Sequence, residues 1–331
     1  MSMQVIKPGM LDTIQDFGRF GYQHLGVNPG GAMDRFALSL ANILVGNRRG
    51  EAGVELHFPA SVFLFRQPAL IALAGADFSA SVNAEPVPTL HPMILGKNDV
   101  LQFHKPVQGA RAYMAVAGGF SLSPWLNSLS THLKVHAGGY MGKAFQKGDE
   151  IPFRGAFIPP GEPGTSPVLP WSTDPQWGDH SEEILVLPGN EWDLLDPASK
   201  ENFSEESFIV NPQSDRMGYR LDHTPLELHT NMEMVSSAVS FGTLQRLPGG
   251  KCILLMADHQ TTGGYPRIGH VITAHHSRLA QLGTGRRIRF RMTTQADAEK
   301  RYRQQQQYLQ QLENACTFRL EKWFHEGLAK L

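Results

Sequence analysis

Glycine and proline interrupt this chain so often that they constrain its fold more than any other feature of the sequence. The 331 residues include 33 Gly and 22 Pro, which together make up about one residue in six. Proline cannot continue a helix or a central strand, and glycine marks turns, so this density favours short segments. A long helical bundle is therefore excluded for most of the chain. The 41% of hydrophobic residues is nevertheless enough for a folded core.

The charge balance excludes general nucleic-acid binding. Thirty basic and 31 acidic residues leave a net charge of −1, so the basic surface that attracts phosphates is missing. No apolar stretch approaches the roughly 18 residues of a membrane-spanning helix, and residues 1–10 lack the apolar region of a signal peptide. Two cysteines cannot form a disulfide framework. We expect a cytoplasmic protein without a membrane partner.

Short β-type runs dominate both halves of the sequence, and they predict a mainly β fold of barrel or sandwich type. In the first half these runs are 54–58, 61–65, 69–75, 99–103 and 111–119; in the second half they are 183–189, 207–210, 251–258, 270–274 and 286–291. One helix is expected from Asp34 to Val45, because its apolar residues share a face and Gly46 follows as a C-cap.

Composition also predicts the domain boundaries. Residues 159–180 are rich in Pro and Gly and read as a linker between an N-terminal β-rich lobe, residues 1–158, and a C-terminal β lobe, residues 181–292. Residues 293–331 form a long amphipathic helix by their apolar spacing, which we expect to pack on the body of the protein. Residues 19–22 (RFGY) resemble residues 216–219 (RMGY), and residues 95–103 resemble residues 282–290 in the same order, so the two lobes are interpreted as related β modules, with coincidence as the alternative.

The first candidate ligand site is the Gly-rich stretch 18–36, which precedes the expected helix and contains Arg19 and His24. Backbone N–H groups at a junction of loop and helix can bind an anion. Asp34 has two possible roles here: it can cap the helix, or it can contact a ligand.

The second candidate site is the stretch 257–270, ADHQTTGGYPRIGH, which follows an apolar run. Polar loops at strand ends often carry binding sites, and the hydroxyl and amide groups here suit carbonyl, amide or phosphate groups. Glycine also permits close approach of the backbone to a ligand. The alternative is an elaborate turn without a ligand. The residues singled out in this stretch are Asp258, Gln260, Thr261, Thr262, Gly263, Gly264 and Tyr265.

Several common site motifs are missing. Residues 138–144 approach a Walker A loop, but the spacing is one residue short and Ala144 replaces the Ser or Thr that holds Mg²⁺. No Rossmann fingerprint, zinc motif or GxSxG elbow is present. His275 and His276 are adjacent in an expected strand, where they would point apart. The metal ligands, if any, stay unknown from the sequence.

A series of long motifs resembles one family over nearly the whole chain up to about Phe290. The motifs are residues 5–47, GADF at 75–78, RAYMAVAGGF at 111–120, KGDEIPF at 147–153, SDRMGYRL at 214–221 and ADHQTTGGYPRIGHVI at 257–272. They are similar to the KipA family, also called allophanate hydrolase subunit 2, biotin-dependent carboxyltransferase or component C of 5-oxoprolinase. The resemblance implies a cyclophilin-like β-barrel architecture.

The resemblance also implies a function and partners. Members work with a KipI-type subunit (component B) and, with a third subunit, form an ATP-dependent 5-oxoprolinase that converts 5-oxo-L-proline to L-glutamate. On this hypothesis ATP with Mg²⁺ is used by the complex. Thr261, Thr262 and the Gly263–Gly264 amides line the site, while Asp258 or Asp34 orients a metal or a substrate NH. Arg216 or Arg19 then stabilises phosphate charge. His24, Gln260 and Tyr265 complete the expected binding residues.

Two alternatives accompany this hypothesis. In the first, the chain is the carboxyltransferase component of a biotin-dependent urea or amide carboxylase, with biotin on another chain because no Met-Lys-Met carrier motif occurs here. In the second, it is a non-catalytic regulator of a partner protein. The sequence also departs from the family pattern at two positions. Ser237 stands where the family commonly has Glu, and Leu129 where it often has Arg.

Overall fold

The protein is mainly β and divides into two compact units. The computed structural model describes residues 1–159, 168–174, 182–230 and 234–328. The first unit contains residues 1–18, 34–175 and 306–331, and the second contains residues 19–33 and 176–305. The linker expected at residues 159–180 falls largely outside the described residues, so the linear boundaries proposed from the sequence stay a prediction.

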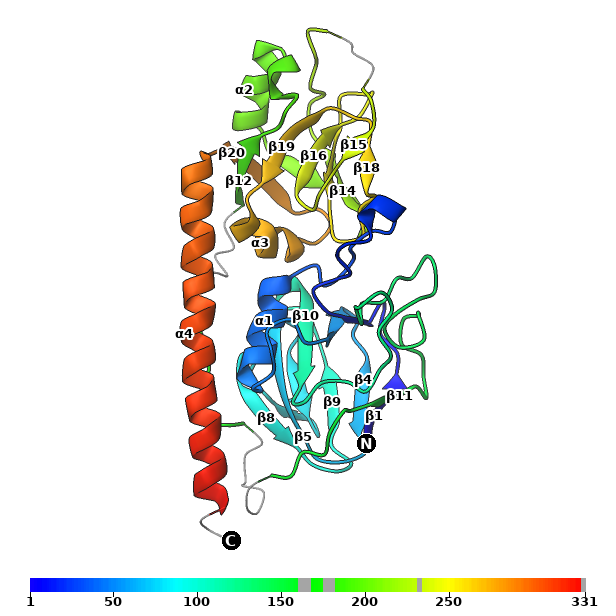
Figure 1. The fold of residues 1–331 in the computed structure, drawn as a ribbon, viewed down its shortest axis with the longest axis vertical. Helices are drawn as coiled ribbons and strands as arrows, with labels where there is room; N and C mark the ends of the chain where they lie inside the picture. The colour runs from blue at the N-terminus through cyan, green and yellow to red at the C-terminus, as the bar shows by residue number, and fades with distance from the viewer. Residues whose placement is uncertain (160–167, 175–181, 231–233, 329–331) are drawn as a thin grey trace. The chain divides into compact units, whose positions relative to one another are not determined.

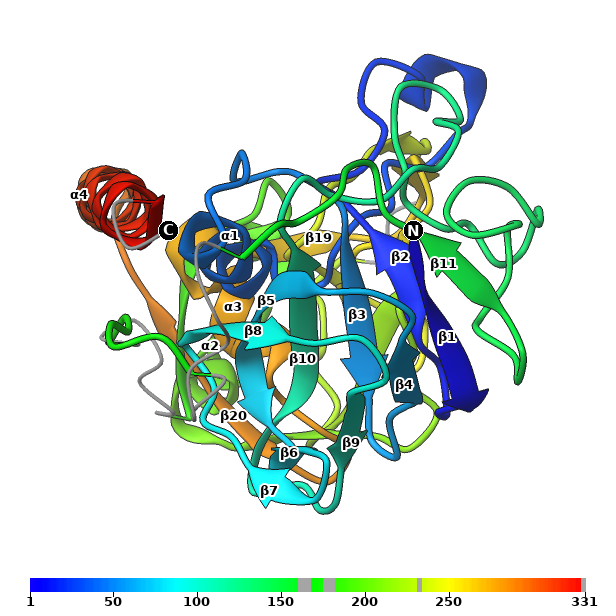
Figure 2. The same cartoon turned by 90° about the horizontal axis from the view of Figure 1, so that it is seen from below.

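The first unit is built on two antiparallel sheets, whose strands are labelled in Figure 2. The six-stranded sheet has the order β11 (Glu150–Pro152), β1 (Ser2–Lys7), β4 (Val62–Phe65), β9 (Val100–Phe103), β6 (Ala80–Val82) and β7 (Glu85–Pro86). The five-stranded sheet has the order β2 (Thr13–Gln15), β3 (Gly53–His57), β10 (Gln108–Val116), β5 (Ala69–Asp77) and β8 (Pro92–Leu95). Buried aromatic and aliphatic side chains of both sheets form one core cluster.

Side chains alternate between the two faces of the five-stranded sheet, as in any strand. On β3, Val54 and Leu56 belong to the core cluster, whereas Glu55 and His57 point to the other face. Helix α1 (Arg35–Leu44) packs against β5 and β10. Its N-cap is Asp34, whose carboxylate accepts a hydrogen bond from the Ala37 amide at 2.9 Å. The expected helix is therefore confirmed, together with the capping role of Asp34.

The second unit contains a closed barrel of seven strands. Their order is β12 (Glu183–Pro188), β19 (Arg267–Val271), β16 (Thr243–Arg246), β17 (Cys252–Leu255), β14 (Gly218–Asp222), β13 (Phe208–Val210) and β20 (Arg287–Met292). Strands β12 and β20 pair in parallel and so close the barrel. Helix α2 (Pro197–Glu205) contributes Phe203, which stacks on Phe290 with ring centroids 5.2 Å apart. The barrel confirms the expected β-barrel architecture (Figure 1).

The strand expected at residues 270–274 is only partly correct. Strand β19 ends at Val271, and the chain continues as the 3₁₀ helix η3 (Thr273–His275) and helix α3 (His276–Ala280). The expectation that His275 and His276 lie on a strand is therefore wrong. His275 is buried at this helical start, where its Nδ1 accepts a hydrogen bond from the Leu185 amide at 3.1 Å. That hydrogen bond to β12 favours the helical turn η3 over a continuation of β19.

The long C-terminal helix is confirmed as α4 (Gln295–Leu328). Leu309, Cys316 and Leu320 are buried along one stripe, as the apolar spacing predicted. Within the first unit, Glu313 on α4 forms an ion pair with Arg49 at 2.7 Å. None of the described helices combines the length and the apolar character that a membrane crossing requires.

Three short elements complete the fold of the second unit. They are the 3₁₀ helix η1 (Gln23–Leu25), the 3₁₀ helix η2 (Trp192–Leu194) and the two-stranded sheet of β15 (Ser237–Ala238) and β18 (Thr262–Gly263). The pairing aligns Ser237 with Gly263. The second Gly-rich stretch also contacts Gln245 of the barrel strand β16, as described below.

Candidate active site

The stretch 257–270 links β17 to β19 in the second unit and is largely ordered by contacts within the protein. Thr262 and Gly263 form β18, and the Thr261 carbonyl accepts a hydrogen bond from the Val239 amide at 3.2 Å. The fully buried Gln245 donates from its amide nitrogen to the Tyr265 carbonyl at 3.4 Å. Pairing with β15 and these hydrogen bonds therefore hold the stretch in place, and it is not an open loop.

The two glycines of this stretch make room for protein atoms. A Cβ at Gly263 would lie 2.5 Å from the side-chain nitrogen of Gln245, and one at Gly264 would lie 3.2 Å from the Ser236 hydroxyl. The side chain of Gln260 also reaches Gln245, with its amide nitrogen 3.4 Å from Oε1. Close packing therefore explains both glycines, Gly263 against Gln245 and Gly264 against Ser236, and an additional approach to a ligand stays a prediction.

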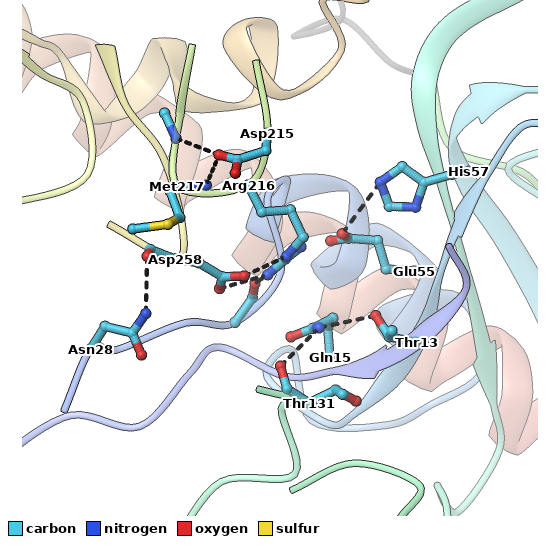
Figure 3. A network of polar contacts seen from close by, with 12 residues as sticks. Thr13, Gln15, Asn28, Glu55, His57, Thr131, Asp215, Arg216, Met217 and Asp258 are labelled. Carbon is cyan, nitrogen blue, oxygen red and sulfur yellow. Dashed lines mark hydrogen bonds and ion pairs between the residues drawn. The ribbon is translucent and has the colours of Figure 1, made fainter. Parts of the chain in front are cut away.

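Arg216 and Asp258, which the sequence placed in separate roles, bind each other (Figure 3). Arg216 donates to the carboxylate of Asp258 from Nε at 2.8 Å and from Nη2 at 3.1 Å. The Nη2 group also donates to the Gly31 carbonyl at 2.6 Å. A two-point contact of this kind fixes both side chains in place. A ligand that binds either side chain must therefore contact the pair or displace one member from the other.

The Gly-rich segment 19–33 meets the pair within the same unit. Asn28 donates from its side chain to the Asp258 carbonyl at 2.9 Å. A Cβ at Gly30 would lie 2.9 Å from Nη1 of Arg19 and 3.5 Å from Oδ1 of Asp258, so both groups border this glycine. Gly30 also has a φ of 61°, which favours glycine. The structure thus brings together Arg19, Arg216 and Asp258 from three distant parts of the sequence.

Other predicted site residues are placed differently. His24 is exposed on η1, and Tyr265 is 44% exposed. Asp34 belongs to the first unit, where it caps α1 and its backbone amide donates to the Tyr113 hydroxyl at 2.8 Å. Of the two roles considered for Asp34, the cap is the one that the contacts show; a contact with a ligand stays a prediction.

Sequence reasoning missed an ion pair at the start of β19, where the stretch 257–270 enters the barrel. Arg267 at the start of β19 contacts Glu191 through its guanidinium at 2.9 and 3.1 Å and through its backbone amide at 2.8 Å. Burial alone would raise the pKa of Glu191, but the hydrogen bonds from Arg267 lower it. Arg267 lies inside the motif at residues 257–272, so the sequence could have indicated it. Glu191 lies outside all the motifs, so nothing in the sequence indicated it as the partner.

The two departures from the family pattern occupy defined places. Ser237 pairs with Gly263, so it stands directly beside the Gly-rich stretch. Leu129 belongs to the hydrophobic core cluster of the first unit, and its backbone amide donates to the Asp16 carboxylate at 2.6 Å. The first departure therefore touches the candidate site, and the second is part of the core.

The acidic, histidine and cysteine side chains do not assemble a metal centre in the described residues, because no three of them converge. Asp258 in particular is already bound by Arg216. Mg²⁺ is usually held by one or two carboxylates together with substrate phosphates, so it needs no such cluster. A dedicated structural metal does not fit the donor set of the described residues.

Comparison with known proteins places this geometry in a family. The family model for the carboxyltransferase domain, subdomain A and B, matches residues 25–292. Component C of the 5-oxoprolinase of Haemophilus influenzae is 34% identical over 91% of this chain and 94% of its own length. The protein of the same name from Escherichia coli is 35% identical over 94% of this chain and 97% of its own length.

Larger proteins contain a similar segment. The urea amidolyase of Lachancea kluyveri is 30% identical over 87% of this chain, which corresponds to 17% of that protein. The crystal structure of Kluyveromyces lactis urea carboxylase matches the fold with a TM-score of 0.83 at 24% identity, over 95% of this chain and 29% of that one. The resemblance found in the sequence motifs is confirmed. This chain belongs to the carboxyltransferase domain family, subdomain A and B.

Proposed function

We propose that this chain is component C of an ATP-dependent 5-oxoprolinase, which converts 5-oxo-L-proline, ATP and water to L-glutamate, ADP and phosphate. The observation that carries this proposal is the match to two proteins of that name over more than nine tenths of both lengths. The proposed partners are a KipI-type subunit and a third subunit, because the name of these relatives describes one part of a complex.

The chemistry requires activation of a poor electrophile. A five-membered lactam resists attack by water, and transfer of a phosphoryl group to its carbonyl oxygen creates a leaving group. Such transfer depends mainly on positioning and on stabilising negative charge. Arg19 and Arg216 supply two guanidinium groups beside Asp258, and this arrangement suits a phosphate better than isolated side chains would. We assign the charge-stabilising role to these arginines and ligand contacts to Thr261 and Thr262.

ATP and Mg²⁺ belong to this proposal as substrates of the complex. The described residues contain no group of three metal-binding side chains, so Mg²⁺ would enter with the nucleotide and be held mainly by its phosphates. We assign no step of the reaction to the metal on this chain.

A second candidate function has its own support. The family model describes a carboxyltransferase domain, and the urea amidolyase of Lachancea kluyveri shares this segment at 30% identity. Under this alternative, the chain takes carboxyl groups from biotin carried by another chain and transfers them to urea or a related amide. The stretch 257–270 would then lie beside the accepting nitrogen.

One assay with two arms tests both candidates. The complete mixture of this chain, the KipI-type subunit and the third subunit receives either 5-oxo-L-proline with ATP, or urea with bicarbonate, ATP, biotin carboxylase and a biotinylated carrier. We expect release of glutamate and phosphate in the first arm and no carboxylation in the second. The double variant Thr261→Val/Thr262→Val should lower the first activity at least about 10-fold. Carboxylation of urea without glutamate release would replace the first proposal by the second.

A further inference from the structure

A buried row of polar side chains lies on one face of the five-stranded sheet of the first unit. The strand register places Thr13 of β2 opposite Glu55 of β3, and Glu55 opposite Tyr113 of β10. All three residues are at most 1% exposed. Neighbouring positions on these strands, such as Val54, belong to the apolar core on the other face. A polar face that is this well buried must find hydrogen-bond partners.

Some side chains of the row form hydrogen bonds with one another or with nearby backbone groups. The Tyr113 hydroxyl accepts a hydrogen bond from the Asp34 amide at 2.8 Å and donates to Oε2 of Glu55 at 2.7 Å. On the other side of Glu55, Nε2 of His57 lies 3.9 Å from Oε1 (Figure 3). The carboxylate at the middle of the row, that of Glu55, is therefore fully buried and is oriented by the Tyr113 hydroxyl.

Gln15 differs from the rest of the row. It follows Thr13 by two residues and so points to the same face, and its side-chain nitrogen donates to the Thr13 hydroxyl at 3.0 Å and to the Thr131 carbonyl at 3.4 Å (Figure 3). A carbonyl oxygen can only accept, so the amide nitrogen must face Thr131 and the orientation of the amide is settled by chemistry. Its oxygen, Oε1, must point elsewhere.

That oxygen is buried and has no hydrogen-bond partner anywhere in the part of the chain that the structure describes. Gln15 is 1% exposed, so bulk water does not reach it freely. A buried carbonyl oxygen without a donor is costly, and few are left so in folded proteins. The group that completes this site must supply an N–H or O–H donor of its own.

We propose that Oε1 of Gln15 accepts a hydrogen bond from the N–H of a small amide, lactam or ureide bound at this polar face. A neutral N–H donor suits a neutral carbonyl acceptor in a buried setting, because it brings no charge that must be stripped of water. The Glu55 carboxylate, with Thr13 next to it, provides further polar surface for such a ligand. Gln15 lies within the motif at residues 5–47, but the sequence analysis did not single it out as a binding residue.

The probe is 5-oxo-L-proline, chosen on the strength of the proposed function, and its lactone analogue, in which a ring oxygen replaces the N–H at the same size. Binding of both is measured at equilibrium on the full chain in its complete complex. We expect the lactam to bind about 10-fold more tightly than the lactone. The lactone has no N–H to donate, and its ring oxygen would face Oε1 of Gln15, which is also a hydrogen-bond acceptor. In Gln15→Met, this preference should fall to about 2-fold or less.

The matched control is Gln67→Met, which makes the same change at another glutamine of the first unit with a buried, unpartnered side-chain nitrogen among the described residues. It should keep the preference of the original chain. The proposal is overturned if Gln15→Met also keeps that preference, which would leave a water molecule as the donor, or if neither compound binds. Should Gln15→Met not fold, an equal affinity of the unaltered complex for lactam and lactone overturns it.

Binding and turnover separate this proposal from the proposed function. If the complex prefers the lactam through Gln15 but releases no glutamate, the binding site is supported and the 5-oxoprolinase assignment is wrong. If the complex releases glutamate while lactam and lactone bind equally, the 5-oxoprolinase assignment is supported and the proposed binding site at Gln15 is wrong.

Discussion

At the scale of single residues, the contacts show how a charged pair is held at the ends of two neighbouring barrel strands, β14 and β17. Arg216 binds the Asp258 carboxylate at two points, and the Gly31 carbonyl takes a third hydrogen bond from the same guanidinium. The sequence motifs indicated both residues but gave them independent roles. They could not show the pairing, because the two positions lie 42 residues apart and only the barrel register brings them together.

His223 gives a prediction for the pH dependence of stability. Its Nε2 accepts from the Cys252 amide at 2.9 Å and its Nδ1 faces the Thr224 carbonyl at 2.7 Å, so the folded protein holds the neutral ring. Burial lowers its pKa from 6.5 to about 4. Between these two values the unfolded chain binds a proton and the folded chain does not, so stability falls as the pH falls.

The expected loss is about 3 kcal/mol between pH 7 and pH 4. Urea unfolding at several pH values measures it. His223→Gln should lack this part of the pH dependence, while His24→Gln, a change at an exposed histidine, should keep it. An identical pH dependence for the unaltered protein and His223→Gln would show that the ring does not resist protonation.

At the scale of elements, the spacing of apolar residues predicted the helices and strands that bury one apolar face. Helix α1 was visible from its spacing, from Asp34 before it and from Gly46 after it, whose φ is 75°. Strand β16 was not, because Thr243, Gln245 and Arg246 are polar and yet buried. Their burial depends on partners from distant segments, such as the Leu226 carbonyl that accepts from Arg246 at 2.9 Å. A local pattern cannot show such partners.

Asp34 carries a prediction at the level of the helix. Loss of its carboxylate in Asp34→Ala removes the hydrogen bond to the Ala37 amide, and a lost N-cap costs about 1 kcal/mol. Chemical unfolding should therefore show lower stability for Asp34→Ala than for Asp34→Asn, which keeps a capping oxygen. If the Ala variant were as stable as the Asn variant, the cap would contribute nothing to this helix.

At the scale of the whole molecule, the sequence predicted the β-rich class, the barrel and the long C-terminal helix, and these are confirmed. It did not predict which segments join which unit. Residues 19–33 belong to the second unit although they precede most of the first in the sequence. Contacts such as Asn28 with the Asp258 carbonyl decide that membership, and they join positions 230 residues apart.

The proposed function makes this chain an essential part of a complex. The most direct measurement is a titration of the chain into fixed amounts of the KipI-type subunit and the third subunit, with 5-oxo-L-proline and ATP present. The account predicts that glutamate release is absent without the chain, rises with its concentration and saturates at a fixed ratio, with one phosphate per glutamate. Glutamate release at full rate without the chain, or none at any ratio of associated, folded subunits, would contradict it.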